Sequence, residues 1–127
     1  MRDIFLITKS KLTWESVKPA VEKAFPDAGG NNSFLLIGKS PKTIQIWFDL
    51  SSEGDKLSDR QEDDTDFPAE VKKQIPFSQG FVTNAEYHLE KEICKLISVL
   101  VPIYPELHLI DDNDKVFSAE EYLAQAQ

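Results

Sequence analysis

The chain has 127 residues, of which 41% are apolar, and a formal net charge of −8. This length and composition predict a single domain, residues 1–127, with one core. The negative charge argues against direct binding to nucleic acid, because it repels the phosphates. The chain has one cysteine, Cys94, which excludes an internal disulfide and a cysteine-based zinc site.

The first part of the chain predicts a strand followed by a helix. Residues 4–8 begin with four consecutive strongly apolar residues, fewer than the roughly 7–15 of a secretory signal, so we expect a buried strand. From Trp14 to residue 25, apolar residues recur every three or four positions, as on one face of a helix. Thr13 is the expected N-cap, because its hydroxyl can accept a hydrogen bond from an amide of the first turn. Pro19 lies inside this pattern, and we expect it to kink the helix or to delay its start.

A hairpin, an acidic loop and a short helix are predicted next. Residues 33–38 and 43–50 are rich in β-forming residues, and the segment between them has the length of a hairpin loop. The second strand alternates apolar residues with others, so Trp47 is expected on the face turned away from the core. Residues 51–66 contain seven acidic and two basic residues, which predicts a solvated loop. Residues 68–75 then predict a short helix that begins at a proline.

Another strand and the main helix follow. Residues 77–82 predict a strand, with Gly80 as a candidate bulge. Residues 85–101 carry an apolar stripe at helical spacing, with charged residues on the other side. Thr83 and Glu86 match a capping box, in which each side chain accepts from an amide at the helix start.

The C-terminal part predicts a hairpin and a short helix. Residues 107–110 and 116–117 flank a turn-rich acidic segment, and Ser118 and Glu121 form a second capping box for a helix over residues 119–126. Two amphipathic helices require one face of a sheet to cover their apolar sides. We therefore predict an α+β two-layer sandwich with a mixed or mostly antiparallel sheet, in the order β-α-β-β-(short α)-β-α-β-β-α.

The sequence predicts no catalytic residue, no cofactor and no metal site. His88 and Cys94 lie on the same predicted helix about 600° of rotation apart, so they point to different faces, and the thiol is expected to be buried and inert. The chain has neither a glycine-rich phosphate loop nor a Gly-x-Ser-x-Gly elbow. The acidic segment that starts at Asp111 does not match a calcium-binding loop, because Val116 stands where that loop requires glycine. We expect a solvated turn there instead.

Acidic and aromatic side chains are the predicted partner-binding residues. In a site for a basic protein, aromatic anchors supply affinity, and acidic residues speed and orient association. Tyr87 and Tyr104 are additional aromatic candidates. The predicted partner-binding set consists of Trp47, Glu53, Asp55, Asp59, Glu62, Asp63, Asp64, Asp66, Phe67, Asp111, Asp112 and Asp114.

In size, acidity, element order and the closing segment LIDDNDKVFS at residues 109–118, the chain resembles the small immunity proteins of bacterial contact-dependent growth inhibition and related polymorphic toxin systems. The resemblance covers the whole chain in layout and about ten residues in motif. It implies a cytoplasmic inhibitor that binds one cognate toxin domain, often a nuclease, and blocks its active site or substrate groove. It transfers no functional residue.

Three other interpretations stay open at this point. The chain could be an acidic DNA-mimic inhibitor of a nucleic-acid enzyme, an adaptor subunit of a larger complex, or a small metal-dependent hydrolase that uses carboxylates. No stretch approaches the roughly 20 apolar residues that span a bilayer, so we expect a protein without a membrane partner. A monomer is favoured, and the expected compartment is the cytoplasm.

Overall fold

The structure, a computed structural model, describes residues 2–39, 42–48, 56, 69–77 and 79–125. Seven strands in these residues form one antiparallel sheet in the order β2-β3-β4-β5-β1-β6-β7. In that spatial order the strands are β2 (Gly29–Gly30), β3 (Phe34–Lys39), β4 (Lys42–Trp47), β5 (Phe81–Tyr87), β1 (Arg2–Thr8), β6 (His108–Ile110) and β7 (Val116–Ser118).

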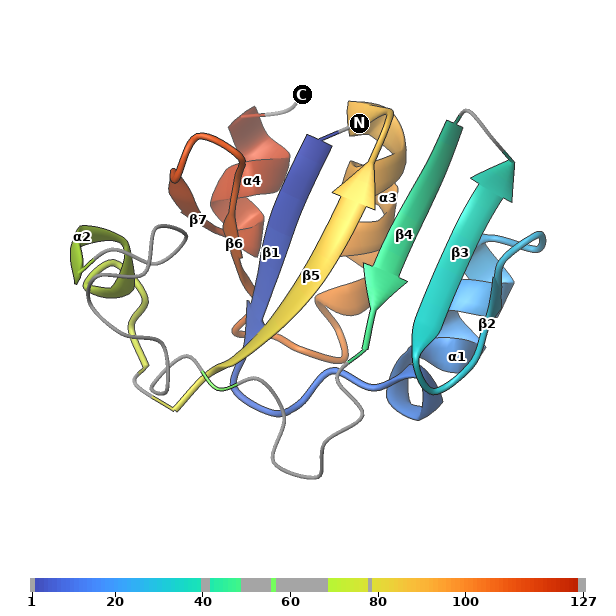
Figure 1. The fold of residues 1–127 in the computed structure, drawn as a ribbon, viewed down its shortest axis with the longest axis horizontal. Helices are drawn as coiled ribbons and strands as arrows, with labels where there is room; N and C mark the ends of the chain where they lie inside the picture. The colour runs from blue at the N-terminus through green and yellow to red at the C-terminus, as the bar shows by residue number, and fades with distance from the viewer. Residues whose placement is uncertain (1, 40–41, 49–55, 57–68, 78, 126–127) are drawn as a thin grey trace.

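Three helices cover one face of this sheet (Figure 1). They are α1 (Trp14–Ala24), α3 (Glu90–Leu100) and α4 (Ala119–Gln125), while the four-residue α2 (Ala69–Lys72) lies to the side of β6 and β7. The arrangement confirms the predicted α+β class with two main amphipathic helices. All strand pairings among the described residues are antiparallel.

The main core lies between the sheet and the three helices. Strand β1 sends Ile4 and Leu6 into it, and α3 sends Ile93 and Leu96, all of them at most 1% exposed. Burial of each such side chain stabilises the fold by about 1.5–3 kcal/mol. The predicted N-cap of α1 is confirmed, because the Thr13 hydroxyl accepts from the Ser16 amide at 3.3 Å.

A smaller apolar cluster lies on the opposite face of the sheet. Ile7 of β1, Val82 of β5 and Ile110 of β6 pack there against Val71 and Ile75, which come from α2 and the turn after it. Alternation explains this, because successive side chains of a strand point to opposite faces. The cluster covers the end of the sheet where β1, β5 and β6 meet.

The structure corrects the predicted boundary between the strand and the main helix. Strand β5 runs from Phe81 to Tyr87, and α3 begins only at Glu90, so Thr83 and Glu86 are strand residues and form no capping box. Pairing along the whole length of β1 explains the longer strand, because seven residues of β5 align with seven of β1. Gly80 is not a bulge. A Cβ there would lie 2.7 Å from the Phe77 ring, so glycine leaves room for that ring.

Two further helix predictions can be compared with the structure. Pro19 does not delay the start of α1, because the helix begins at Trp14 and runs through the proline to Ala24. One missing backbone hydrogen bond at this exposed position is offset by the buried apolar face of the helix.

The predicted capping box of the C-terminal helix is confirmed. The Ser118 amide donates to the Glu121 carboxylate at 3.0 Å, and the Glu121 amide donates to the Ser118 hydroxyl at 3.1 Å.

Candidate functional site

One part of the sheet has no described helix over it. On the face opposite α1 and α3, the registers of β3, β4, β5 and β1 align side chains in two cross-strand rows. We call this surface the open face. Its first row is Leu36, Gln45, Glu86 and Asp3, and its second row is Phe34, Trp47, Asn84 and Phe5.

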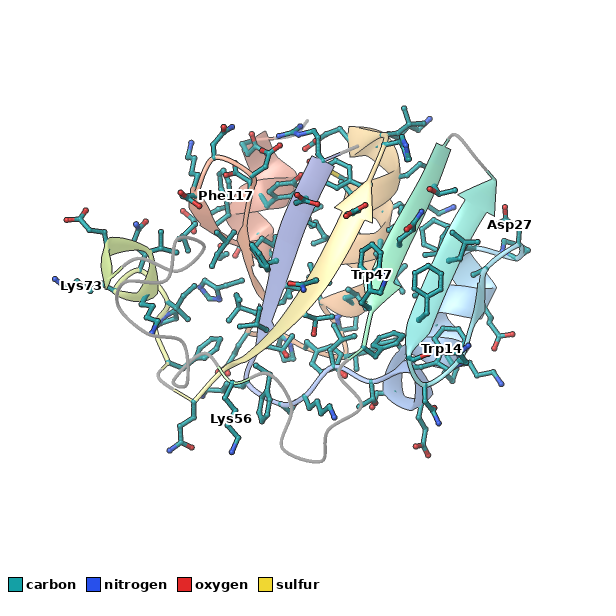
Figure 2. The ribbon with its side chains drawn as sticks, viewed as in Figure 1. Trp14, Asp27, Trp47, Lys56, Lys73 and Phe117 are labelled. Atoms are coloured by element: carbon teal, nitrogen blue, oxygen red, sulfur yellow. The ribbon has the colours of Figure 1, made fainter. Side chains whose placement is uncertain are left out.

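Of the three aromatic residues on this face, Trp47 is the exposed one, while Phe5 and Phe34 are half-buried. Its neighbours in sequence, Ile46 and Phe48, point into the main core, whereas Trp47 is 39% exposed. Its ring contacts Phe34 on the adjacent strand, with the ring centroids 5.6 Å apart. Figure 2 shows Trp47 in front of the sheet, turned away from the helices. The prediction from alternation that it faces away from the core is confirmed.

Two carboxylates line the same part of the open face, with Glu86 nearer to the Trp47 ring than Asp3. Asp3 and Glu86 are direct partners in the register of β1 and β5. Neither forms an ion pair with a described Lys, Arg or His. Desolvation raises the pKa of Glu86, and the charge of Asp3 and a hydrogen bond with it raise this pKa further. The charge of His88 lowers this pKa, but by less than desolvation and Asp3 raise it. The open face therefore carries two neighbouring acids that form no ion pair with a described residue.

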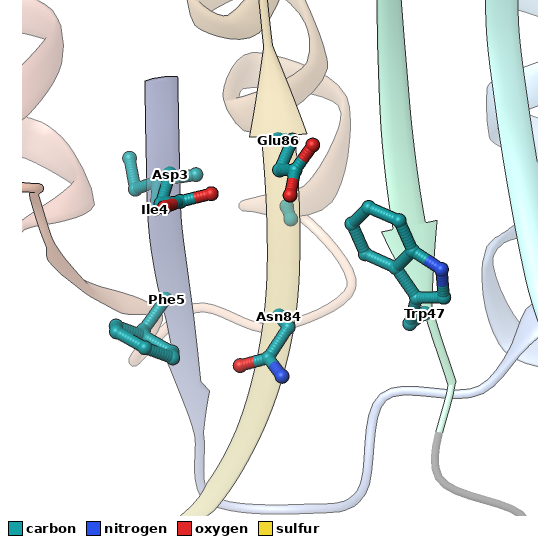
Figure 3. Close-up of a pocket in the computed structure, with 7 residues that line it drawn as sticks. Asp3, Ile4, Phe5, Trp47, Asn84 and Glu86 are labelled. Atoms are coloured by element: carbon teal, nitrogen blue, oxygen red, sulfur yellow. The ribbon is translucent and has the colours of Figure 1, made fainter. Parts of the chain in front are cut away.

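A cavity of about 400 Å³ opens at this place. Figure 3 shows the Asp3 and Glu86 carboxylates on adjacent strands, with the Trp47 indole on the other side of Glu86. The lining residues are Asp3, Ile4, Phe5, Trp47, Asn84, Ala85 and Glu86. The cavity thus combines an aromatic wall, an amide and two acids, a set that suits an organic cation.

The predicted acidic residues of the β6–β7 turn lie elsewhere and have local roles. The Asp111 carboxylate accepts from the amides of Asn113 and Lys115 at 2.9 Å each, which closes the turn. Asp112 forms an ion pair with Arg2 at 3.3 Å. Asp114 is exposed and has a φ of 61°, a left-handed conformation that Asp tolerates in turns. The structure does not bring these three residues onto the open face.

The remaining predicted partner-binding residues lie outside the described residues, as does most of the predicted acidic loop. They are Glu53, Asp55, Asp59, Glu62, Asp63, Asp64, Asp66 and Phe67. Within residues 51–66 only Lys56 is described, and it forms a bridge with Phe81. The two tyrosines proposed as further anchors are core residues, because Tyr87 is 1% and Tyr104 is 6% exposed.

Sequence reasoning missed Asp3, Glu86 and Asn84. Alternation along residues 2–8 would have placed Asp3 on the face opposite Ile4. The same pattern along residues 81–87 would have placed Asn84 and Glu86 opposite Ala85. Glu86 was instead assigned to a helix cap, which hid its place in the strand.

A polar network ties the first strand to the helices on the other side of the sheet. Glu90 accepts from the hydroxyls of Tyr122 at 2.7 Å and Tyr87 at 3.2 Å, and it pairs with Arg2 at 3.2 Å. Desolvation raises the pKa values of both tyrosines. It also raises the pKa of the nearby Cys94 thiol, and the charge of Glu90 adds to that effect.

Comparisons with protein-family models, curated proteins and solved structures gave no match. Among the helices of the described residues, none combines the length and apolar composition needed to cross a bilayer. In the same part of the chain, no three His, Cys, Asp or Glu side chains are grouped so that they would hold a metal ion.

Proposed function

We propose that this protein is an inhibitor that works by binding a basic partner protein on the open face. The observation that carries the proposal is the exposed Trp47 ring on the same face as Glu86 and its cross-strand partner Asp3, neither of which forms an ion pair with a described residue. Aromatic residues with an apolar body supply most of the affinity at protein interfaces. Acidic residues around them speed and orient the approach of a basic partner.

The chemistry of the whole chain supports a basic partner. A net charge of −8 on 127 residues attracts a positively charged protein over long distances. On the open face, Leu36 is 38% exposed and lies in the row next to Trp47, so apolar contact area accompanies the charge. A face that joins apolar contacts with fixed negative charge suits a protein surface that carries arginine and lysine residues.

The specific form of the proposal is an immunity protein that neutralises a cognate bacterial toxin domain. The resemblance in size, acidity and element order to immunity proteins of contact-dependent growth inhibition supports this form. A nuclease groove that binds nucleic acid is basic, so an acidic sheet face can occupy it and exclude the substrate. Inhibition would then follow from coverage of the groove, with no chemistry on the inhibitor.

The test is capture of a tagged copy from its native cells, followed by an activity assay on what binds. We expect one stoichiometric partner with a basic domain, which arrests growth when expressed alone and does not when this chain is co-expressed. Glu86→Lys should abolish both binding and protection. Glu22→Lys, an equal charge change on the exposed side of α1, should preserve both. A partner that is harmless alone, or one that Glu86→Lys still neutralises, would contradict the proposal.

A further inference from the structure

We infer that the cavity on the open face binds one arginine side chain of the partner, between the Trp47 indole and the carboxylates of Glu86 and Asp3. The inference rests on the proposed function, because it names the group by which that partner is recognised. Three observations support it: the register of β4, β5 and β1, the exposure of the Trp47 ring, and the cavity itself.

The register places the recognition groups around a single position. Glu86 is opposite Asp3 on one side and opposite Gln45 on the other. Trp47 follows Gln45 by two residues on the same face, so it is the diagonal neighbour of Glu86. Diagonal neighbours lie about 7–8 Å apart, within reach of aromatic side chains. A cation that contacts the Glu86 carboxylate can therefore also lie against the indole ring.

The two carboxylates of the cavity favour a cationic ligand over a neutral one. Like charges directly opposite one another on adjacent strands destabilise a sheet, and Asp3 and Glu86 form such a pair. A cation on the open face beside this pair offsets the repulsion and can donate charge-assisted hydrogen bonds to the carboxylates. The raised pKa of Glu86, caused first by desolvation and then by the charge of Asp3, agrees with this arrangement.

The shape and the lining favour arginine over lysine. A guanidinium group is planar, stacks on aromatic rings and presents several N–H donors to more than one acceptor at once. The cavity is lined by the Trp47 and Phe5 rings, two carboxylates and the Asn84 amide. A lysine ammonium is a more strongly hydrated point charge, and it would use fewer of these groups.

The experiment needs no partner and uses N-acetyl-arginine amide as the probe. Titration into ¹⁵N-labelled protein comprising residues 1–127 is followed at the indole N–H signals of the two tryptophans. We expect a saturable shift of the Trp47 signal and none of Trp14, which is 8% exposed and serves as an internal reference. N-acetyl-lysine amide should bind roughly threefold more weakly or worse, and N-acetyl-norleucine amide should leave the Trp47 signal unshifted.

Variants separate the groups that are proposed to act. The Asp3→Asn, Glu86→Gln double variant should lose at least about tenfold in affinity for the arginine compound, since both charge-assisted bonds are weakened. Glu22→Gln should bind like the wild type. The spectra themselves report whether each variant folds. No shift of Trp47, an equal shift with the norleucine compound, or unchanged affinity in the double variant would overturn the inference.

The failure of this inference differs from a failure of the proposed function. A partner toxin that binds the Asp3→Asn, Glu86→Gln variant as tightly as the wild type contradicts the arginine site and leaves the inhibitor function intact. If the cavity binds the arginine compound but the captured partner is harmless when expressed alone, the inhibitor function is contradicted. The arginine site is then still supported.

Discussion

Asp3 and Glu86 are directly opposite each other on β1 and β5, so two carboxylates share one position near the centre of the sheet. Because desolvation and Asp3 raise the pKa of Glu86 in the folded protein, the folded state holds the Glu86 proton more tightly than the unfolded state. Stability therefore falls as pH rises from the unfolded pKa of Glu86 through its folded pKa. The full penalty is present above the folded pKa.

We predict that Glu86→Gln stabilises the protein at neutral pH. Removal of one member of a like-charge cross-strand pair is worth about 0.5 kcal/mol, or an increase in Tm of roughly 2 °C for a domain of this size. At pH 3, where glutamic acid is protonated in both states, the difference should vanish. Thermal unfolding at both pH values measures it, with Glu22→Gln as the control that should not gain. A loss of stability at pH 7 would contradict the prediction.

The hydrogen bonds and the ion pair that Glu90 forms with Tyr122, Tyr87 and Arg2 should stabilise the folded protein measurably. Tyr122→Phe removes the 2.7 Å bond to this carboxylate, and hydrogen bonds to charged groups contribute about 1.5–3 kcal/mol. We expect a loss of about 2 kcal/mol in the free energy of unfolding, measured by urea denaturation. Glu92→Gln on the same helix is the matched control and should cost less than about 0.5 kcal/mol. Equal costs for the two variants would show that the network is not stabilising.

The same network predicts an alkaline transition. The pKa values of Tyr87 and Tyr122 are raised by burial, so their contribution to stability is complete below the unfolded tyrosine pKa of about 10 and is lost as pH rises above it. In a Tyr104→Phe background, which retains only these two tyrosines, absorbance at 295 nm should rise together with the loss of helical circular dichroism. Tyrosine ionisation near pH 10 with the helices intact would contradict this.

The paired glycines before β3 provide a packing test with a built-in control. A Cβ on Gly30 would lie 3.0 Å from the Phe34 carbonyl oxygen and 3.2 Å from the Trp14 ring, whereas a Cβ on Gly29 would meet nothing within 4 Å. Gly30→Ala should therefore cost about 1–2 kcal/mol. Gly29→Ala should be neutral or slightly stabilising. Chemical denaturation measures the free energy of unfolding of both variants. Equal losses of stability in the two would refute the prediction.

Fluorescence quenching tests the charge around Trp47 without any ligand. Trp47 is 39% exposed and Trp14 is 8% exposed, so quenchers in solution should act mainly on Trp47. Because the neighbouring carboxylates attract cations and repel anions, the ratio of caesium to iodide quenching should fall in the Asp3→Asn, Glu86→Gln variant. The ratio should stay constant in Glu22→Gln. An unchanged ratio in the double variant would mean that the two acids do not set the local potential.

Local sequence patterns predicted much of the fold. The α+β class, the Thr13 cap and the outward face of Trp47 follow from periodicity and capping chemistry, which act over a few residues, and all three are confirmed. The boundary between β5 and α3 could not be read locally. Residues Thr83 to Tyr87 are held as a strand by pairing with β1, about 80 residues away in sequence.

The candidate site depends on the same long-range pairing. Trp47 was predicted from alternation within one strand, but the pair formed by Asp3 and Glu86 exists only through the register between β1 and β5. The acidic residues at 53–66 were predicted from composition alone and stay a prediction. Asp111 and Asp112 were selected for their charge, and the structure assigns them to a turn and to an ion pair with Arg2.

Site-specific photocrosslinking tests the central claim most directly. A benzoylphenylalanine in place of Gln45 lies in the acidic row of the open face, and one in place of Glu22 lies on α1, on the opposite side of the sheet. In native cells we predict that the residue at position 45 captures one basic protein, that the residue at 22 does not, and that Glu86→Lys abolishes the crosslink. Capture from position 22 alone, or a crosslink at 45 that Glu86→Lys leaves unchanged, would contradict binding at the open face.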